Sequence, residues 1–175
     1  MGDRSALWEQ FTAIDADHSG NISAEELCKV FSTPAVPPNI PAYTMPPNIG
    51  RMLCRMVSSD NPHVEFKEFV TLDTFVREVQ GVFLRFDRDK SGEMSFAELM
   101  PAIQQVGFTL QQGLVGSLMR AFDPSQSGAL TYSGFLSLCA VLGLARTLFS
   151  SWDTNKSQTV TLSYDQLLCC LMWFM

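Results

Sequence analysis

Residues 15–26 read DADHSGNISAEE, and residues 87–98 read DRDKSGEMSFAE. Both stretches have Asp at positions 1 and 3, Ser at 5, Gly at 6, an apolar residue at 8, Ser at 9 and Glu at 12. Together they contain eight of the 18 acidic residues of the chain. Oxygen-bearing side chains therefore recur at fixed intervals around a glycine, which is the residue that best tolerates a sharp turn with positive φ.

This spacing is typical of loops that bind Ca²⁺, a hard cation that takes six to eight oxygen ligands. Positions 1, 3, 5, 9 and 12 supply side chains, position 7 supplies its backbone carbonyl, and the Glu at 12 gives two oxygens. The first loop predicts Asp15, Asp17, Ser19, Asn21, Ser23 and Glu26 as ligands. The second predicts Asp87, Asp89, Ser91, Glu93, Ser95 and Glu98. An acidic surface turn is the alternative, and two full matches make it the weaker interpretation.

The same frame of helix, polar loop, aliphatic residue and helix recurs three more times, in loops 57–68, 123–134 and 153–164. We call the five units hands 1 to 5 and their loops 1 to 5. The pattern predicts an all-α fold of about eight helices in a single domain spanning residues 1–175. Loops 2 and 3, and loops 4 and 5, begin 30 residues apart (57 to 87 and 123 to 153). This spacing predicts one long helix shared by each pair, at about 65–86 and 132–152.

Loops 2, 4 and 5 lack essential ligands. Loop 2 has Val57 at position 1 and Pro62 at position 6, so Glu68 alone is not expected to hold calcium. Loop 4 has Gly134 at position 12. Loop 5 has Asp153 as its only carboxylate ligand, with Tyr164 at position 12, and is predicted to be at best a weak site.

Such loops pair through their position-8 residues, so we expect Ile22 to meet Val64 and Met94 to meet Leu130. Loop 5 is then left without a partner at Val160. The last helix ends in LLCCLMWFM, residues 167–175. An unpaired strand edge beside an apolar helix can template association, so we expect an interface there rather than an intramolecular core helix.

Residues 32–47 contain six prolines and predict an extended, partly polyproline connection between hands 1 and 2. A plain linker and a partner-binding or lid segment are both open. The five cysteines form no metal-binding spacing and favour reduced core thiols.

The formal net charge of −6 argues against nucleic-acid binding, which needs clustered Lys and Arg. The two histidines, His18 and His63, both fall in loops, and no cysteine has an evident histidine partner, so we expect no enzyme. Residues 1–10 lack the apolar segment of a signal peptide, and with reduced thiols this favours a cytoplasmic location.

The two complete loops, the shared-helix spacings and SSWDTNKSQTVTLSYDQ before an apolar terminus resemble the penta-EF-hand family, from Leu7 to the end of the chain. The resemblance implies calcium in hands 1 and 3, homodimers or heterodimers through hand 5, and movement to membranes or target peptides when calcium rises.

We therefore expect a calcium sensor or adaptor that dimerises through hand 5 and exposes apolar surface to protein targets or membranes. Two alternatives remain open. One is a regulatory subunit of a larger enzyme, such as a calpain-type protease, and the other is a passive calcium buffer.

Overall fold

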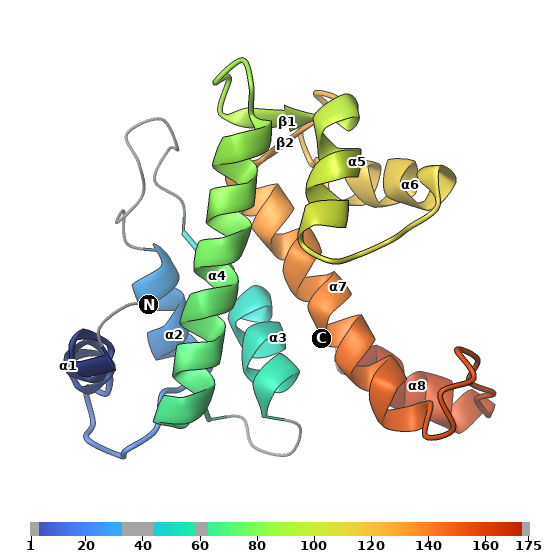
Figure 1. Cartoon of the computed structure of the whole chain (residues 1–175). Coiled ribbons are helices and arrows are strands. Elements are labelled where there is room, and N and C mark those ends of the chain that lie inside the picture. Colours follow the sequence, from blue (N-terminus) through green and yellow to red (C-terminus); the bar gives the residue numbers. More distant parts are fainter. Residues whose placement is uncertain (1–3, 33–43, 59–62, 173–175) are drawn as a thin grey trace.

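The computed structural model describes residues 4–32, 44–58 and 63–172. Within these ranges it contains eight α-helices and two short strands (Figure 1). The predicted all-α architecture of about eight helices is therefore confirmed.

Hands 1 and 2 form the N-terminal pair. Helices α1 (Arg4–Ile14) and α2 (Ala24–Ser32) flank loop 1, and α3 (Pro47–Val57) and α4 (Phe66–Phe86) flank loop 2. The backbones of Ile22 and Val64 exchange two hydrogen bonds of 2.8 Å, which confirms the predicted pairing of these loops.

Hands 3 and 4 pair in the same way. Helix α4 enters loop 3 and α5 (Phe96–Gln105) leaves it, while α6 (Gln112–Phe122) and α7 (Tyr132–Trp152) flank loop 4. Strands β1 (Glu93–Ser95) and β2 (Ala129–Thr131) are antiparallel, and Met94 lies opposite Leu130 as predicted. Both of these side chains are fully buried, so the pairing ties the two loops to the core.

The two shared helices are 21 residues each and cross in the middle of the molecule (Figure 1). Helix α4 starts one residue later than predicted because Glu65 caps its N-terminus. Helix α7 starts at the predicted residue, where the Thr131 hydroxyl accepts a hydrogen bond from the Gly134 N–H. These caps satisfy backbone N–H groups that a helix start would otherwise leave unpaired.

Helix α7 is the one helix in the described ranges that is long and apolar enough to suit a membrane span. Nine of its residues are buried, including Phe135 and Leu138, and they belong to the hydrophobic core. Residues 134–145 carry no charge and lie within this helix, which extends further in both directions. Its burial is that of a core helix in a globular domain.

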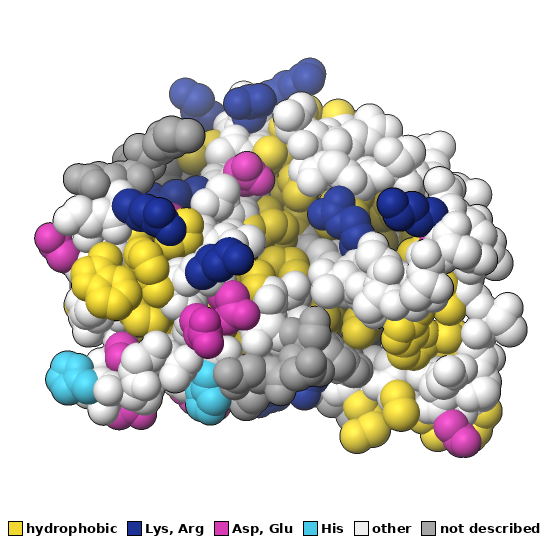
Figure 2. All heavy atoms as spheres, turned by 60° about the horizontal axis from the view of Figure 1, so that its bottom comes forward, with side chains coloured by type: hydrophobic (Ala, Val, Ile, Leu, Met, Phe, Trp, Pro, Cys, Tyr) yellow, Lys and Arg dark blue, Asp and Glu magenta, His cyan; other side chains and the backbone are white. Residues whose placement is uncertain are grey.

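Helix α8 (Tyr164–Met172) lies at the far end of α7, and none of its residues is buried. Its exposed apolar residues are Tyr164, Leu167, Leu168, Leu171 and Met172. Figure 2 shows hydrophobic side chains at the surface in this region, at the lower right. The apolar side chains of α8 are therefore not buried in the hydrophobic core. This agrees with the expectation that α8 is not an intramolecular core helix.

The prediction of five core thiols is correct for Cys28, Cys54 and Cys139, which are buried. It is wrong for Cys169, which is exposed, and for Cys170, which is half-buried, because both lie on α8. Burial raises the pKa of the Cys54 thiol to about 12, so this thiol stays protonated at neutral pH.

The Pro-rich connection is described only at its ends. Ser32 closes α2, and its hydroxyl accepts a hydrogen bond of 2.6 Å from the N–H of buried Met45. Pro46 has the extended backbone that the sequence predicts (φ −62°, ψ 141°), and Pro47 begins α3. The first turn of a helix tolerates proline because its N–H has no partner there. Residues 33–43 lie outside the described residues.

Candidate calcium sites

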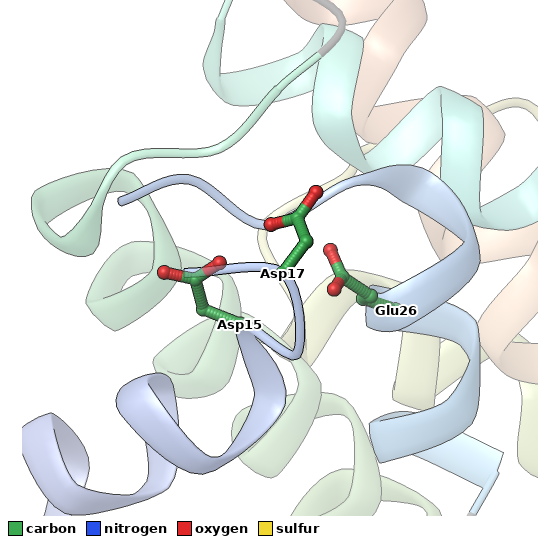
Figure 3. Close-up of side chains that lie close together, drawn as sticks. All are labelled: Asp15, Asp17 and Glu26. Carbon is green, nitrogen blue, oxygen red and sulfur yellow. The ribbon is translucent and has the colours of Figure 1, made fainter. Parts of the chain in front are cut away.

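Loop 1 brings three carboxylates together. Ligand atoms of Asp15, Asp17 and Glu26 all lie within 4.8 Å of one another. Figure 3 shows Asp15 at the end of α1, Asp17 in the loop and Glu26 on the first turn of α2, with their carboxylates converging. Converging carboxylate oxygens are the donor set that Ca²⁺ requires.

Hydrogen bonds from the loop backbone fix the Asp15 carboxylate. One oxygen accepts from the Ser19 N–H at 2.9 Å, and the other accepts from the Gly20 N–H at 2.8 Å. Gly20 has φ +79°, which turns the chain back toward Asp15. The sharp turn predicted at position 6 is therefore present.

Glu26 closes the loop. Its carboxylate accepts from the N–H and the hydroxyl of Ser23, at 2.9 and 2.8 Å, and from the N–H of Ala16 at 3.1 Å. Partial burial raises the pKa of Glu26, but these hydrogen bonds outweigh it and the net pKa is lowered. A lowered pKa keeps the group ionised, which metal binding needs. Glu26 is also the third residue of α2, so the predicted closing ligand of the loop and the glutamate that caps the helix are one residue.

The position-5 and position-7 groups of loop 1 are also in contact. The Ser19 hydroxyl donates to the Asn21 carbonyl at 3.0 Å. The pKa of Asp17 is lowered, and the largest cause is its hydrogen bond with the Ser19 side chain. All six predicted ligand residues of loop 1 therefore take part in hydrogen bonds within the loop.

Loop 3 repeats this network position by position. Asp87 accepts from the N–H groups of Ser91 and Gly92, both at 3.0 Å, and the Ser91 hydroxyl donates to the Glu93 carbonyl at 2.9 Å. Glu98 accepts from the N–H and hydroxyl of Ser95, at 3.0 and 2.7 Å.

Further contacts of loop 3 match those of loop 1 as well. Glu98 accepts from the Arg88 N–H at 3.2 Å, as Glu26 does from Ala16. The Ser95 hydroxyl lowers the pKa of Glu98, and the Ser91 side chain lowers the pKa of Asp89. Two separate sequences thus build the same pattern of hydrogen bonds, and among the described residues the approach of three carboxylates to within 4.8 Å is found in loop 1.

Loop 2 keeps only the closing side of this arrangement. The Glu68 carboxylate accepts from the Glu65 N–H at 2.9 Å, within the capping box of α4. Val57, at position 1, is the last residue of α3 and offers no side-chain oxygen. Residues 59–62, including Pro62, lie outside the described residues.

Loop 4 holds its shape through Asp123. The Asp123 carboxylate accepts from the Ser125 hydroxyl at 2.6 Å and from the Gly128 N–H at 2.8 Å. At position 12 Gly134 has no side chain to close the cage. The loop therefore keeps the turn of a calcium loop without its closing ligand.

Loop 5 differs from its predicted alignment. The sequence places Tyr164 at position 12, but the contact that Glu26 makes with Ser23 is made here by Gln166, whose Oε1 accepts from the Ser163 N–H at 2.8 Å. Ser163 and Gln166 lie two residues beyond positions 9 and 12. The loop is thus two residues longer between Val160 and its exit helix. The sequence signal that marks this is the capping-box pattern S-x-x-Q at 163–166.

Family models match all of loop 1 and loop 3 from residue 90 onward. The model described as EF hand matches residues 9–31, and the EF-hand domain pair matches residues 90–141. The chain is also similar in fold to the structure of a homolog of programmed cell death 6 protein from Leishmania major Friedlin, with a TM-score of 0.61 and 24% identity. That match covers 97% of this chain and 94% of the other.

Relatives match nearly the whole chain. Penta-EF hand domain-containing protein 2 of Dictyostelium discoideum is 30% identical over 157 residues, covering 90% of this chain and 73% of that protein. Mouse sorcin is 26% identical, with 95% of this chain and 82% of sorcin covered. Human peflin is 26% identical over 90% of this chain, which spans 54% of peflin's length. The chain therefore belongs to the penta-EF-hand family of calcium-binding proteins.

Proposed function

We propose that the protein is a calcium sensor that binds one Ca²⁺ in loop 1 and one in loop 3. The observation that carries this proposal is that the two loops have the same internal hydrogen bonds. Each loop offers three carboxylates, two serine hydroxyls and one backbone carbonyl as ligands. The proposed ligands are the twelve residues predicted from the sequence. Loops 2 and 4 act as their strand partners, since each lacks a ligand that the cage requires.

Binding has a mechanical consequence at Glu26 and Glu98. Bidentate coordination needs both carboxylate oxygens to face the ion. Each carboxylate is engaged here by Ser23 and Ala16, or by Ser95 and Arg88. Turning it toward the ion must move the exit helix that carries it. Buried Leu27 and Leu99 follow directly on α2 and α5, so this movement would expose apolar surface to a target.

Calorimetry tests the sites. We expect two ions per chain with dissociation constants on the order of 10⁻⁷ to 10⁻⁵ M. Glu26→Gln and Glu98→Gln should each remove one ion. Glu25→Gln and Glu93→Gln are matched controls, because they remove the same charge but spare the side-chain ligands, and both should retain two ions. Tight binding of two ions by the double Glu26→Gln, Glu98→Gln variant would overturn the assignment.

A hydrophobic dye or a peptide pull-down separates a sensor from a buffer. Calcium should increase dye binding in the wild type, and the increase should fall in either glutamine variant. Equal dye binding and partner capture in calcium and in chelator would favour a passive buffer or a constitutive subunit. A cytoplasmic location and reversible association with membranes remain predictions.

We further propose that two chains pair through hand 5. Within the described residues Val160 has no strand partner, and α8 presents five exposed apolar side chains. An apolar cavity of about 190 Å³ lies between α7, loop 5 and α8, lined by residues that include Phe149, Trp152 and Leu162. The same surface suits a second copy or the matching hand of a larger enzyme's subunit. Native mass in a cell extract distinguishes these partners.

We infer binding rather than catalysis for this chain. Cys54 and His63 line one cavity of about 160 Å³. Burial raises the pKa of Cys54 to about 12, whereas a nucleophilic cysteine needs a lowered pKa. Assay of the purified protein for hydrolysis of general thiol-protease and esterase substrates tests this, and turnover abolished by Cys54→Ser would contradict it.

A further inference from the structure

Helix α3 packs directly against the exit helix of loop 1. A Cβ on Gly50 of α3 would overlap the sulfur of Cys28 and lie 2.9 Å from the carbonyl oxygen of Ala24. Ala24 and Cys28 both lie on α2, which also carries Glu26. The two helices have no free space between them here, so a shift of α2 must be passed to α3.

The other end of α3 packs against α7, the entering helix of hand 5. A Cβ on Gly143 of α7 would overlap the sulfur of Met56. The Thr147 hydroxyl, one turn further along α7, donates to the Met56 carbonyl at 3.4 Å. Met56 therefore touches α7 with both its side chain and its backbone. Figure 1 shows α3 lying between α2 and α7.

Helix α3 also reaches the exit helix of hand 5. The Arg55 guanidinium donates to the carbonyl oxygen of Met172, the last residue of α8, at 3.0 Å. A cation at the C-terminal end of a helix binds unpaired carbonyls and suits the helix dipole. The last turn of α3 thus holds both helices of hand 5, although hands 2 and 5 are far apart in the chain.

We propose that α3 couples the calcium site of hand 1 to the pairing surface of hand 5, so that an ion in loop 1 changes the affinity between two copies of the chain. This inference rests on the proposed calcium and pairing functions. The ion pulls Glu26, and α2 moves α3 through the Gly50 contact. Helix α3 then shifts Met56 and Arg55 against α7 and α8. Because packed helices shift between discrete arrangements, a small movement at loop 1 alters the angle of α8.

Coupling of this kind is reciprocal. If calcium in loop 1 changes the pairing affinity by some factor, pairing must change the calcium affinity of loop 1 by the same factor. Hand 3 reaches α7 by a different contact, in which Arg146 donates to the Gly107 carbonyl just beyond α5 at 3.3 Å. The proposed route through α3 therefore belongs to hand 1.

Analytical ultracentrifugation in calcium and in chelator measures the effect. We expect the dimer dissociation constant of the full chain to change by about fivefold or more between the two conditions. The change should be lost in Glu26→Gln and retained in Glu98→Gln. A dissociation constant that is equal in calcium and chelator, or a change that survives Glu26→Gln, would overturn the coupling.

A second variant tests the route. Arg55→Ala with Thr147→Val removes the Arg55–Met172 and Thr147–Met56 hydrogen bonds between α3 and the described part of hand 5, and leaves both calcium loops intact. The variant should still bind two ions and still pair, with a calcium effect on pairing below about twofold. Arg120→Ala, which removes an exposed arginine bond to Ser117 on α6, should keep the full effect. Full retention in the double variant overturns the route through α3.

Different experimental outcomes would refute the proposed function and the coupling inferred here. A wild-type chain that stays monomeric in both conditions, or that binds no calcium, refutes pairing or sensing, and the coupling falls with it. Two bound ions and a dimer whose affinity ignores calcium refute the coupling alone. Calcium titrations of Glu98→Gln at low and high protein concentration give the reciprocal measurement, and the loop 1 affinity should depend on protein concentration.

Discussion

Gly134 and the carbonyl oxygen of Phe122 approach so closely that a Cβ added to Gly134 would lie 2.9 Å from that oxygen. Gly134 is position 12 of loop 4, where loops 1 and 3 have their closing Glu. The exit helix of hand 4 therefore starts closer to its entering helix than a side chain allows. Loop 4 is not a calcium loop that lost one ligand by a single substitution.

Gly134→Glu should accordingly fail to create a third calcium site. We expect two ions per chain by calorimetry, as in the wild type, and a free energy of unfolding lower by about 1–3 kcal/mol from overpacking. Denaturant unfolding in chelator measures the loss. Gly113→Ala is the control, because a Cβ there meets nothing within 4 Å. A third ion bound by Gly134→Glu would show that the helices of hand 4 separate freely.

Gln166→Glu should give loop 5 a weak calcium site, because the Gln166 side chain occupies the closing position. Asp153 and the new carboxylate would then oppose each other across the loop. We expect a third ion with a dissociation constant on the order of 10⁻⁴ to 10⁻³ M, since only two carboxylates contribute. Tyr164→Glu, at the position that the sequence alignment suggests, should add no site. Calorimetry with both variants decides between the two alignments, and a gain from Tyr164→Glu would refute the structural one.

Leu167→Glu with Leu171→Glu should abolish pairing. The two residues are four apart on α8, lie on one face of the helix and are exposed in the single chain. Charges there would have to be buried without partners in a dimer, which costs several kcal/mol. Sedimentation should show a monomer that still binds two calcium ions. Leu114→Glu on α6, which is similarly exposed, should leave the dimer intact. A dimer that persists in the α8 variant places the interface elsewhere.

Ser125→Ala should raise the pKa of Asp123, because the Ser125 hydroxyl is the largest cause of its lowered value. A carboxyl whose pKa is lowered in the folded protein adds stability at pH values above its unfolded pKa of about 3.9. That stability is lost as pH falls through the folded pKa. The variant should therefore lose stability above about pH 4 and differ less from the wild type below it.

NMR titration of the Asp123 carboxyl in chelator measures the pKa, and thermal unfolding across the acid range measures the stability. Ser117→Ala is the control, because its hydroxyl donates to the Gly113 carbonyl rather than to a carboxylate. An unchanged Asp123 pKa in Ser125→Ala would show that the backbone N–H groups alone hold this loop in its turn.

Loop 5 shows where residue spacing fails to predict which side chain occupies the closing position of a loop. Counting twelve residues from Asp153 gives Tyr164, and the count assumes that every loop has the same length. The chain instead inserts two residues after Val160, and α8 begins only at Tyr164. The capping pair Ser163 and Gln166 records the true helix start, because a cap is a local interaction of neighbouring residues. In loop 5 the capping pattern therefore locates the closing position, whereas residue counting does not.

The cysteines of α8 mark a second limit. Residues 164–172 are apolar enough to read as a core helix, and hydrophobicity alone does not say what covers such a helix. Cys139 is buried because α7 crosses the middle of the fold, whereas Cys169 is exposed because α8 lies beyond it. Only the position of the helix in the fold separates the two cases.

The sequence by itself determined the five hands, the two complete calcium loops, the strand pairs Ile22–Val64 and Met94–Leu130, and both shared helices. These features follow from ligand chemistry, turn geometry and helix length, which act over a few neighbouring residues. The tertiary structure alone decided that α3 contacts both helices of hand 5 and that Gly134 has no room for a side chain. It also decided that α8 remains uncovered. Such contacts join residues that are distant in the chain, and their fit depends on how whole helices pack rather than on any local pattern.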